Sequence, residues 1–169
     1  ILPLEKQDSF DTIVKARNMS QTIDSWKFSD GSQYVLPVYS NPILFGWRLD
    51  SLKELGFDEV PRTYSDLLKV VDKIKGTDKA LWAKKDLADP TAWMRWFDFF
   101  PLYNAASEGA SFGENNQFTA NEAAMTDVFG LMHTLADAKV LRTGEATDPF
   151  ENGDSIMTDL GPWTFPNWE

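Results

Sequence analysis

The sequence contains no cysteine, and it has a single histidine among its 169 residues. Without cysteine the chain cannot form disulfide bonds, iron–sulfur clusters, thiolate zinc sites or cysteine nucleophiles. This absence does not indicate a cellular compartment, because exported and cytosolic proteins can both lack cysteine. Any zinc site or serine–histidine–acid triad would have to use His133, which we expect to be a partly exposed helix residue instead. The sequence therefore predicts no metal site.

Positive charge is also scarce in this chain. Lysine and arginine total 16 against 26 aspartates and glutamates, so the net charge is -10. A phosphate backbone or an anionic membrane surface requires a basic face on the protein, and we expect no nucleic-acid partner. The glycines are scattered over turns and helix ends instead of forming a phosphate-binding loop. We therefore expect no nucleotide or other cofactor.

Long apolar runs are missing as well. No stretch approaches the roughly 20 residues of a transmembrane helix. No secretory signal peptide is visible at the start of the sequence. The chain begins at Ile1 instead of methionine and stops where a helix should begin, so we expect it to be a processed or excised part of a longer protein.

Aromatic residues, in contrast, are abundant, with 7 tryptophans and 12 phenylalanines. Most of them should fill the core, and we expect this of Phe165 and Trp168. A minority can line a binding surface. A sugar presents hydroxyl groups, which carboxylates and amides bind, and an apolar C–H face, which packs on an aromatic ring. Rings combined with acids favour a sugar site, but the acids also leave open a glycoside hydrolase that uses two of them.

Capping residues and apolar stripes predict several helices. One covers 9–16, one begins at Asp50 and ends at Gly56, one follows Asp89-Pro90, and another begins at Gly161. Thr63 and Thr119 are the predicted N-caps of two further helices, with Asp66 and Glu122 at the capping-box position. The first of these two carries the stripe Leu67, Val70, Val71 and Ile74, and the second carries Met125, Val128, Phe129, Met132, Leu135 and Ala136.

Four stretches predict strands, namely Gln33–Val38, Ile43–Trp47, Ala80–Ala83 and Ser155–Thr158. The second is almost continuously apolar, which is typical of a strand buried on both faces. Residues 107–118 predict a loop or a small hairpin. Short strands that alternate with longer helices indicate the α/β class, with a small central sheet covered by helices.

Several segments, taken in order, resemble one known family. They are Tyr34-Val-Leu-Pro-Val-Tyr-Ser-Asn41, Ile43-Leu-Phe-Gly-Trp-Arg-Leu-Asp-Ser-Leu-Lys-Glu-Leu-Gly-Phe57, Val60-Pro-Arg-Thr-Tyr-Ser-Asp-Leu-Leu68, Phe150-Glu-Asn-Gly153 and Ile156-Met-Thr-Asp-Leu-Gly-Pro-Trp163. Their order is similar to that in the family 1 extracellular solute-binding proteins of ABC importers, which include maltose-binding-protein-like receptors. Two positions depart from the family pattern. Gly46-Trp47-Arg48 replaces an aromatic–Tyr–Asn sequence, and Ile156 stands where alanine is usual.

This resemblance implies one lobe of a type II periplasmic-binding-protein-like fold, in truncated form. Residues 1–169 would be part of a single lobe, with the amino-terminal lobe and the carboxy-terminal remainder absent. Ligands of the family bind in the cleft between two lobes. The implied function is that of the extracytoplasmic substrate-binding component of an ABC importer, which binds a sugar or oligosaccharide and is not an enzyme.

The resemblance also implies candidate ligand-binding residues. Tyr39 and Asn41 fall where the chain crosses from one lobe to the other, close to the cleft. Asp89 and Trp93 lie at the start of a helix that faces the cleft in relatives. Trp163 matches the tryptophan that stacks on sugar in maltose-binding relatives. No catalytic residue is implied.

The implied partners are a carbohydrate ligand and the membrane-embedded permease subunits of the importer, which the full-length protein would contact as a monomer. The implied location is extracytoplasmic, either in a periplasm or as a lipoprotein on the surface of a Gram-positive bacterium. Two alternatives stay open at this point. One is a glycoside hydrolase fragment with paired carboxylates, and the other is an interaction domain without a ligand.

Overall fold

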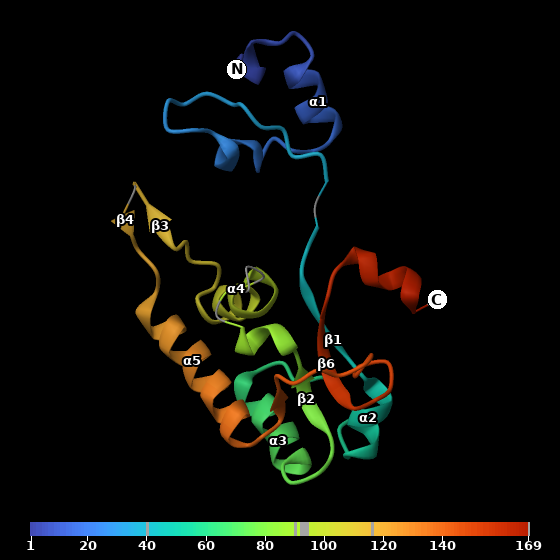
Figure 1. Ribbon diagram of the computed structural model, residues 1–169. Coiled ribbons are helices and arrows are strands. Elements are labelled where there is room, and N and C mark those ends of the chain that lie inside the picture. Colours follow the sequence, from blue (N-terminus) through green and yellow to red (C-terminus); the bar gives the residue numbers. More distant parts are fainter. Residues whose placement is uncertain (40, 90, 92–94, 116, 169) are drawn as a thin grey trace. The chain divides into compact units, whose positions relative to one another are not determined.

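The computed structural model describes residues 1–39, 41–89, 91, 95–115 and 117–168 (Figure 1). The chain divides into two compact units, Ile1–Asn41 and Pro42–Glu169. The first unit contains the 3₁₀ helix η1 (Leu4–Lys6), the helix α1 (Phe10–Ala16) and the 3₁₀ helix η2 (Ile23–Trp26). The predicted helix over 9–16 is therefore confirmed. The prediction that residues 1–169 form part of one lobe stays a prediction.

The predicted strand Gln33–Val38 is wrong, because its backbone groups bond to partners outside any sheet. The N–H of Gln33 donates to Glu5 Oε2 at 3.0 Å, and the carbonyl of Gln33 accepts from the N–H of Leu4 at 2.7 Å. The Val38 carbonyl accepts from Arg17 Nη1 at 2.9 Å. Gln33 forms one isolated bridge, and no ladder follows it. An apolar alternating stretch becomes a strand only where a second strand pairs with it.

The second unit is built on a four-stranded mixed sheet. Its strands are β1 (Leu44–Trp47), β2 (Ala80–Ala83), β5 (Leu141–Arg142) and β6 (Ser155–Leu160), in the order β1-β6-β2-β5. The strands β5, β2 and β6 run parallel, and β1 pairs with β6 in the antiparallel sense. A separate hairpin of β3 (Gly113–Glu114) and β4 (Gln117–Phe118) confirms the small hairpin expected in 107–118.

Helices flank this sheet, which confirms the predicted α/β class with a small covered sheet (Figure 1). They are α2 (Leu49–Glu54), α3 (Tyr64–Ile74), α4 (Arg95–Ala106) and α5 (Glu122–Asp137), with the 3₁₀ helices η3 (Lys85–Ala88) and η4 (Pro162–Asn167). The predicted stripe of α3 is buried, and Leu81, Trp82 and Ile156 at the sheet centre have no exposed surface. Among the described residues, no helix combines the length and the apolar character that crossing a bilayer requires.

The strand predicted over Ile43–Trp47 exists, but it is not buried on both faces. It lies at the edge of the sheet, where it pairs with β6 alone, and Leu44 is 54% exposed. Phe165 and Trp168, expected in the core, are also exposed, at 50% and 38%. The indole N–H of Trp168 donates to Glu151 Oε1 at 2.9 Å. Apolar sequence alone does not distinguish an edge from a centre, because β-branched and aromatic side chains are enriched in strands generally and the difference arises from packing context.

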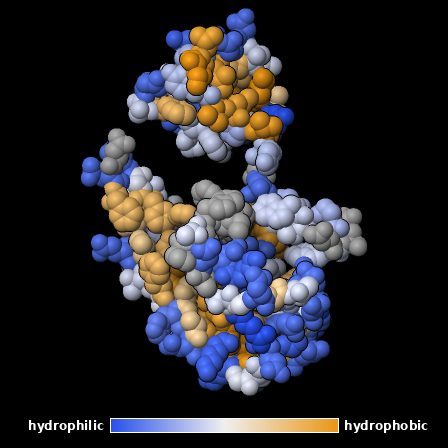
Figure 2. Space-filling view, viewed as in Figure 1, coloured by the Kyte–Doolittle hydropathy of each residue, from blue (hydrophilic) through white to orange (hydrophobic). Residues whose placement is uncertain are grey.

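The helix α5 begins later than predicted, and its buried face is rotated. Asn121, not Thr119, is the N-cap, because its side-chain oxygen accepts from the N–H of Ala124 at 3.0 Å. Leu131 is buried, whereas Phe129 is 57% exposed. Figure 2 shows apolar side chains gathered over α5 and the β3–β4 hairpin. Phe129 still contacts the ring of Phe99 on α4, with ring centroids 5.3 Å apart, so helix–helix contact replaces full burial.

A cationic clamp fixes the start of β6 to the end of β1. Arg48 Nη1 donates to the carbonyl oxygens of Phe150 and Glu151, both at 2.8 Å. The same guanidinium donates to both carboxylate oxygens of Asp50, at 3.1 and 2.5 Å. These bonds from Arg48, followed by a bond from the backbone N–H of Ser51, lower the pKa of Asp50 from 3.8 to about 2. Arg48 therefore ties together segments that lie far apart in the sequence.

The first prediction concerns the cap of α5. Asn121→Ala removes the bond to the Ala124 N–H and leaves that donor unsatisfied, so we expect a loss of about 1 kcal/mol in the free energy of unfolding. Urea denaturation of the full-length protein measures this loss. Thr119→Ala is the control, and it should leave the urea midpoint unchanged. A larger effect of Thr119→Ala than of Asn121→Ala would place the cap at the residue that the sequence pattern predicts.

The second prediction concerns the clamp and pH. Because the pKa of Asp50 is lower in the folded state, folding gains stability from this carboxylate above about pH 4 and loses it as the pH falls through about 2. Arg48→Gln should return the pKa of Asp50 towards 3.8. Carboxyl NMR titration measures this shift. Arg62→Gln, which removes an exposed arginine paired with Glu59 at 3.8 Å, should leave the Asp50 titration unchanged.

Candidate binding site

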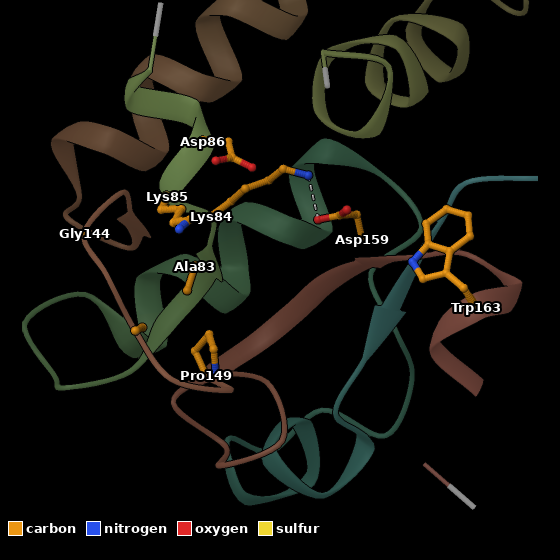
Figure 3. Close-up of a pocket in the computed structure, with 9 residues that line it drawn as sticks. Ala83, Lys84, Lys85, Asp86, Gly144, Pro149, Asp159 and Trp163 are labelled. Carbon is orange, nitrogen blue, oxygen red and sulfur yellow. Dashed lines mark ion pairs between the residues drawn. The ribbon is translucent and has the colours of Figure 1, made fainter. Parts of the chain in front are cut away.

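A hollow of about 500 Å³ opens in the second unit at the carboxyl ends of the parallel strands (Figure 3). Its lining residues are Ala83, Lys84, Lys85, Asp86, Gly144, Ala146, Pro149, Asp159 and Trp163. Most of them follow the last residue of β2 or β5 or lie near the end of β6. Since β5 and β6 lie on opposite sides of β2, the segments that leave these strands border one shared space. Crevices of this kind, outside the carboxyl ends of strands, are the usual ligand sites of α/β sheets.

An ion pair lines this hollow. Lys84 Nζ is 2.9 Å from Asp159 Oδ1, and the two side chains are only 11% and 22% exposed. The register of the sheet explains the contact, because Trp82 of β2 lies opposite Met157 of β6, and two residues further on Lys84 lies beside Asp159. Lys84 Nζ also lies 5.7 Å from the centre of the buried Trp82 ring, within the range of a cation–π interaction. Both ions are thus held in place by neighbours.

Trp163 stands to one side of this ion pair, on η4 (Figure 3). The residue is 49% exposed, and its indole packs against Gly161. A Cβ atom at position 161 would lie 2.2 Å from ring carbons of Trp163, a distance that no real contact allows. Both the N–H and the hydroxyl of Thr164 donate to the Gly161 carbonyl, at 2.9 and 2.8 Å, which fixes the turn beneath the ring. Glycine therefore lets the six-membered ring of the indole lie close to the backbone while the residue stays half exposed.

The charges that line the hollow balance one another. Lys84 and Lys85 are the two cationic residues, and Asp86 and Asp159 are the two carboxylates. Lys85 pairs with Glu145 at 3.2 Å, and both of these side chains are largely exposed. Within the described residues, no group of three or more histidine, cysteine or acidic side chains is placed to hold a metal ion. His133 is exposed on α5 and lies 3.2 Å from Asp137, as expected of a surface helix residue.

Four of the five residues that the sequence suggests for a binding site fall within the described chain. Trp163 lines the hollow at the strand ends. Tyr39 and Asn41 line a different hollow of about 650 Å³ inside the first unit, together with Trp26 and five further residues of that unit.

Asp89 and Trp93 complete the predicted set. Asp89 follows η3 and is exposed, and its Oδ1 accepts from the N–H and hydroxyl of Thr91 at 2.8 and 2.7 Å. It is not among the residues that line the hollow beside Trp163. Trp93 lies outside the described residues, and so does Pro90, with which Asp89 was predicted to begin a helix. The first described residue of α4 is Arg95.

Sequence reasoning missed Lys84 and Asp159. A usable signal was present, because each is a charged residue at the carboxyl end of a strand that the sequence does predict. The sequence pattern does not reveal that β2 and β6 are parallel neighbours in the sheet. With this information, the two charges would be expected side by side at the edge where ligands bind.

Residues 3–169 match the model of the family described as bacterial extracellular solute-binding protein. A comparison with curated protein sequences finds no match. Among solved structures, the chain is similar to the protein lmo0859 of Listeria monocytogenes EGD-e, with 62% identity and a TM-score of 0.92. That match covers 99% of this chain but 42% of the Listeria protein, so the chain spans less than half the length of this relative.

Two more distant structures share the fold. The sugar-binding protein MalE from Xanthomonas citri has 16% identity and a TM-score of 0.65, and the match covers 99% of this chain and 43% of that one. The substrate-binding protein Lmo0181 from Listeria monocytogenes has 20% identity and a TM-score of 0.62, with 96% and 44% covered. Both likenesses confirm the predicted periplasmic-binding-protein-like fold. The match of the family model over residues 3–169 shows that the chain belongs to the bacterial extracellular solute-binding proteins.

Proposed function

We propose that this chain supplies part of the sugar-binding site in the substrate-binding component of an ABC importer. The observation that carries the proposal is the half-exposed indole of Trp163 beside a mostly buried ion pair, in a hollow at the carboxyl ends of parallel strands. A pyranose ring offers an apolar C–H face to an indole and hydroxyl groups to charged side chains. The hollow provides both kinds of partner within one space.

Relatives of the same fold support this ligand class. The Xanthomonas citri protein is a sugar-binding protein, and Lmo0181 is an ABC substrate-binding protein solved with cycloalternan. Because the chain spans only 42% of the Listeria relative with 62% identity, we propose that a second lobe completes the site in the full-length protein. Closure of the two lobes over the sugar would then trap it and present the closed form to the permease.

The remaining parts of the proposal concern the other residues and the setting. We propose that Tyr39, Asn41, Asp89 and Trp93 contribute further ligand contacts from the cleft side of the full-length protein. The protein would act as a monomer outside the cytoplasm, in a periplasm or anchored as a lipoprotein, without enzymatic activity. Its partners would be the carbohydrate and the permease subunits. The family is one of binding proteins, which supports a binding role over hydrolysis.

The third prediction tests the stacking role of Trp163. A screen of the full-length protein with maltotriose, cellotriose and cycloalternan by thermal shift should identify a stabilising glycan, because a ligand of the folded state raises the melting temperature. Isothermal titration with that glycan should then show that Trp163→Ala weakens binding at least about tenfold, through lost stacking and lost apolar burial. Phe165→Ala is the matched control, because Phe165 lies on the same η4 helix with similar exposure, 50% against 49%.

Three results would contradict the proposal. Equal losses in Trp163→Ala and Phe165→Ala would show that η4 matters only as a whole. The absence of any glycan-induced shift across the panel would remove the sugar as the ligand. Cleavage of a glycan that disappears on Asp86→Asn or Asp159→Asn would instead support the glycoside hydrolase alternative.

The fourth prediction concerns Gly161. In Gly161→Ala the added methyl group would meet ring carbons of Trp163 at 2.2 Å, so the indole must leave its place over the backbone. We expect glycan affinity to fall about as far as in Trp163→Ala. The variant should remain folded, so its urea midpoint should change only slightly. Titration calorimetry measures the first effect, and denaturation measures the second. Gly144→Ala is the control, since a Cβ there meets no atom within 4 Å and Gly144 lines the same hollow.

A further inference from the structure

The proposed sugar site contains a feature that selects among sugars, and the following inference rests on that proposed function. We infer that the ion pair of Lys84 and Asp159 determines specificity, so that the hollow accepts uncharged oligosaccharides and rejects sugars that carry a carboxylate or a free amine. The geometry that supports this is the 2.9 Å contact between two side chains that are only 11% and 22% exposed. Specificity of this kind depends on excluding competitors as much as on binding the correct ligand.

The balance of charge in the hollow is the first argument. Its lining includes two lysines and two aspartates, although the whole chain carries a net charge of -10. An acidic protein that bound a cationic sugar would be expected to line the site with excess carboxylates, and one that bound an anionic sugar would need excess cations. This lining has neither excess, so it offers no net counter-charge to a charged ligand.

Burial of the pair is the second argument. Ions that have lost most of their water depend on each other for compensation, and disturbing such a pair is costly. A ligand carboxylate near Asp159, or a ligand amine near Lys84, would add a like charge to a site with little water left to screen it. A hydroxyl group adds none. A carboxylate has about four acceptor positions, so Asp159 can hold Lys84 and still accept a hydrogen bond from a sugar hydroxyl.

Cross-strand position is the third argument. Lys84 follows β2 directly and its N–H donates to the carbonyl of Arg142 at 2.8 Å, while Asp159 belongs to β6. The backbone at both residues is therefore held by strand pairing, not by a loop. Charged groups on such supports keep their geometry when a ligand enters, which is what discrimination between similar sugars requires.

The test compares three ligands in three forms of the full-length protein. The ligands are the tightest-binding neutral glycan of the panel, its derivative with one hydroxymethyl group oxidised to a carboxylate, and its derivative with one hydroxyl replaced by an amine. The wild type should prefer the neutral glycan. Asp159→Asn removes the carboxylate beside Lys84 and should shift the affinity ratio about tenfold towards the carboxylate derivative, whereas Lys84→Met should shift it about tenfold towards the amine derivative.

The control is a second ion pair of the same composition. Lys75 Nζ lies 2.6 Å from Asp72 Oδ1, and both side chains are largely exposed. Asp72 belongs to α3, Lys75 follows its last residue, and neither lines the hollow. Lys75→Met and Asp72→Asn make the same changes in net charge, and neither should shift the ligand ratios. Thermal unfolding of each variant without ligand establishes that it is folded.

The outcomes separate this inference from the function on which it rests. If the wild type binds the neutral glycan and Trp163→Ala weakens this binding as predicted, but both pair variants weaken all three ligands by the same factor, the specificity role is refuted and the sugar-binding function stands. Equal shifts in the Lys75 and Asp72 variants would also refute it, because net charge alone would then explain the ratios. A wild type that binds none of the glycans contradicts both.

Discussion

The parallel pairing of β2 with β6 is the constraint on which the rest of the second unit depends. It sets Trp82 opposite Met157, which buries both side chains, and it brings Lys84 beside Asp159 two residues later. The same register that closes the core therefore positions the charges of the hollow. A shift by one residue would turn side chains to the opposite face of the sheet. Such a shift would both separate Lys84 from Asp159 and expose Trp82.

A second constraint follows at the end of β6, where the strand passes into η4. The chain must turn sharply there and still offer an aromatic ring to the hollow. Gly161 makes this possible because its lack of a side chain lets the ring of Trp163 lie against the backbone. A ring without this support would adopt several rotamers, and ordering it in one of them would cost conformational entropy.

The sequence predicts those features of this fold that depend on neighbouring residues. The α3 stripe and the Thr63–Asp66 capping box are visible because helix bonds and helix faces repeat over three or four residues. Strand pairing joins distant segments, which the local pattern does not specify. The strand predicted over Gln33–Val38 is therefore wrong, because no second strand pairs with it. The Lys84–Asp159 pair was missed for the same reason, although both flanking strands were recognised. Trp163, which lines the hollow, was predicted as a ligand-binding residue through family resemblance, which carries the non-local information that periodicity lacks.

The departure of Arg48 from the family pattern has a physical role in this chain. Arg48 donates to the carbonyls of Phe150 and Glu151, and Lys79 Nζ donates to the carbonyl of Gly153 at 2.5 Å. Two cations thus hold the turn from which β6 starts, and a third, Lys84, holds Asp159 near its other end. Each of these three cations contacts backbone carbonyls or a mostly buried carboxylate, where a charge-assisted bond contributes more than an exposed surface pair. The strand that carries the hollow is consequently anchored by charge at both ends.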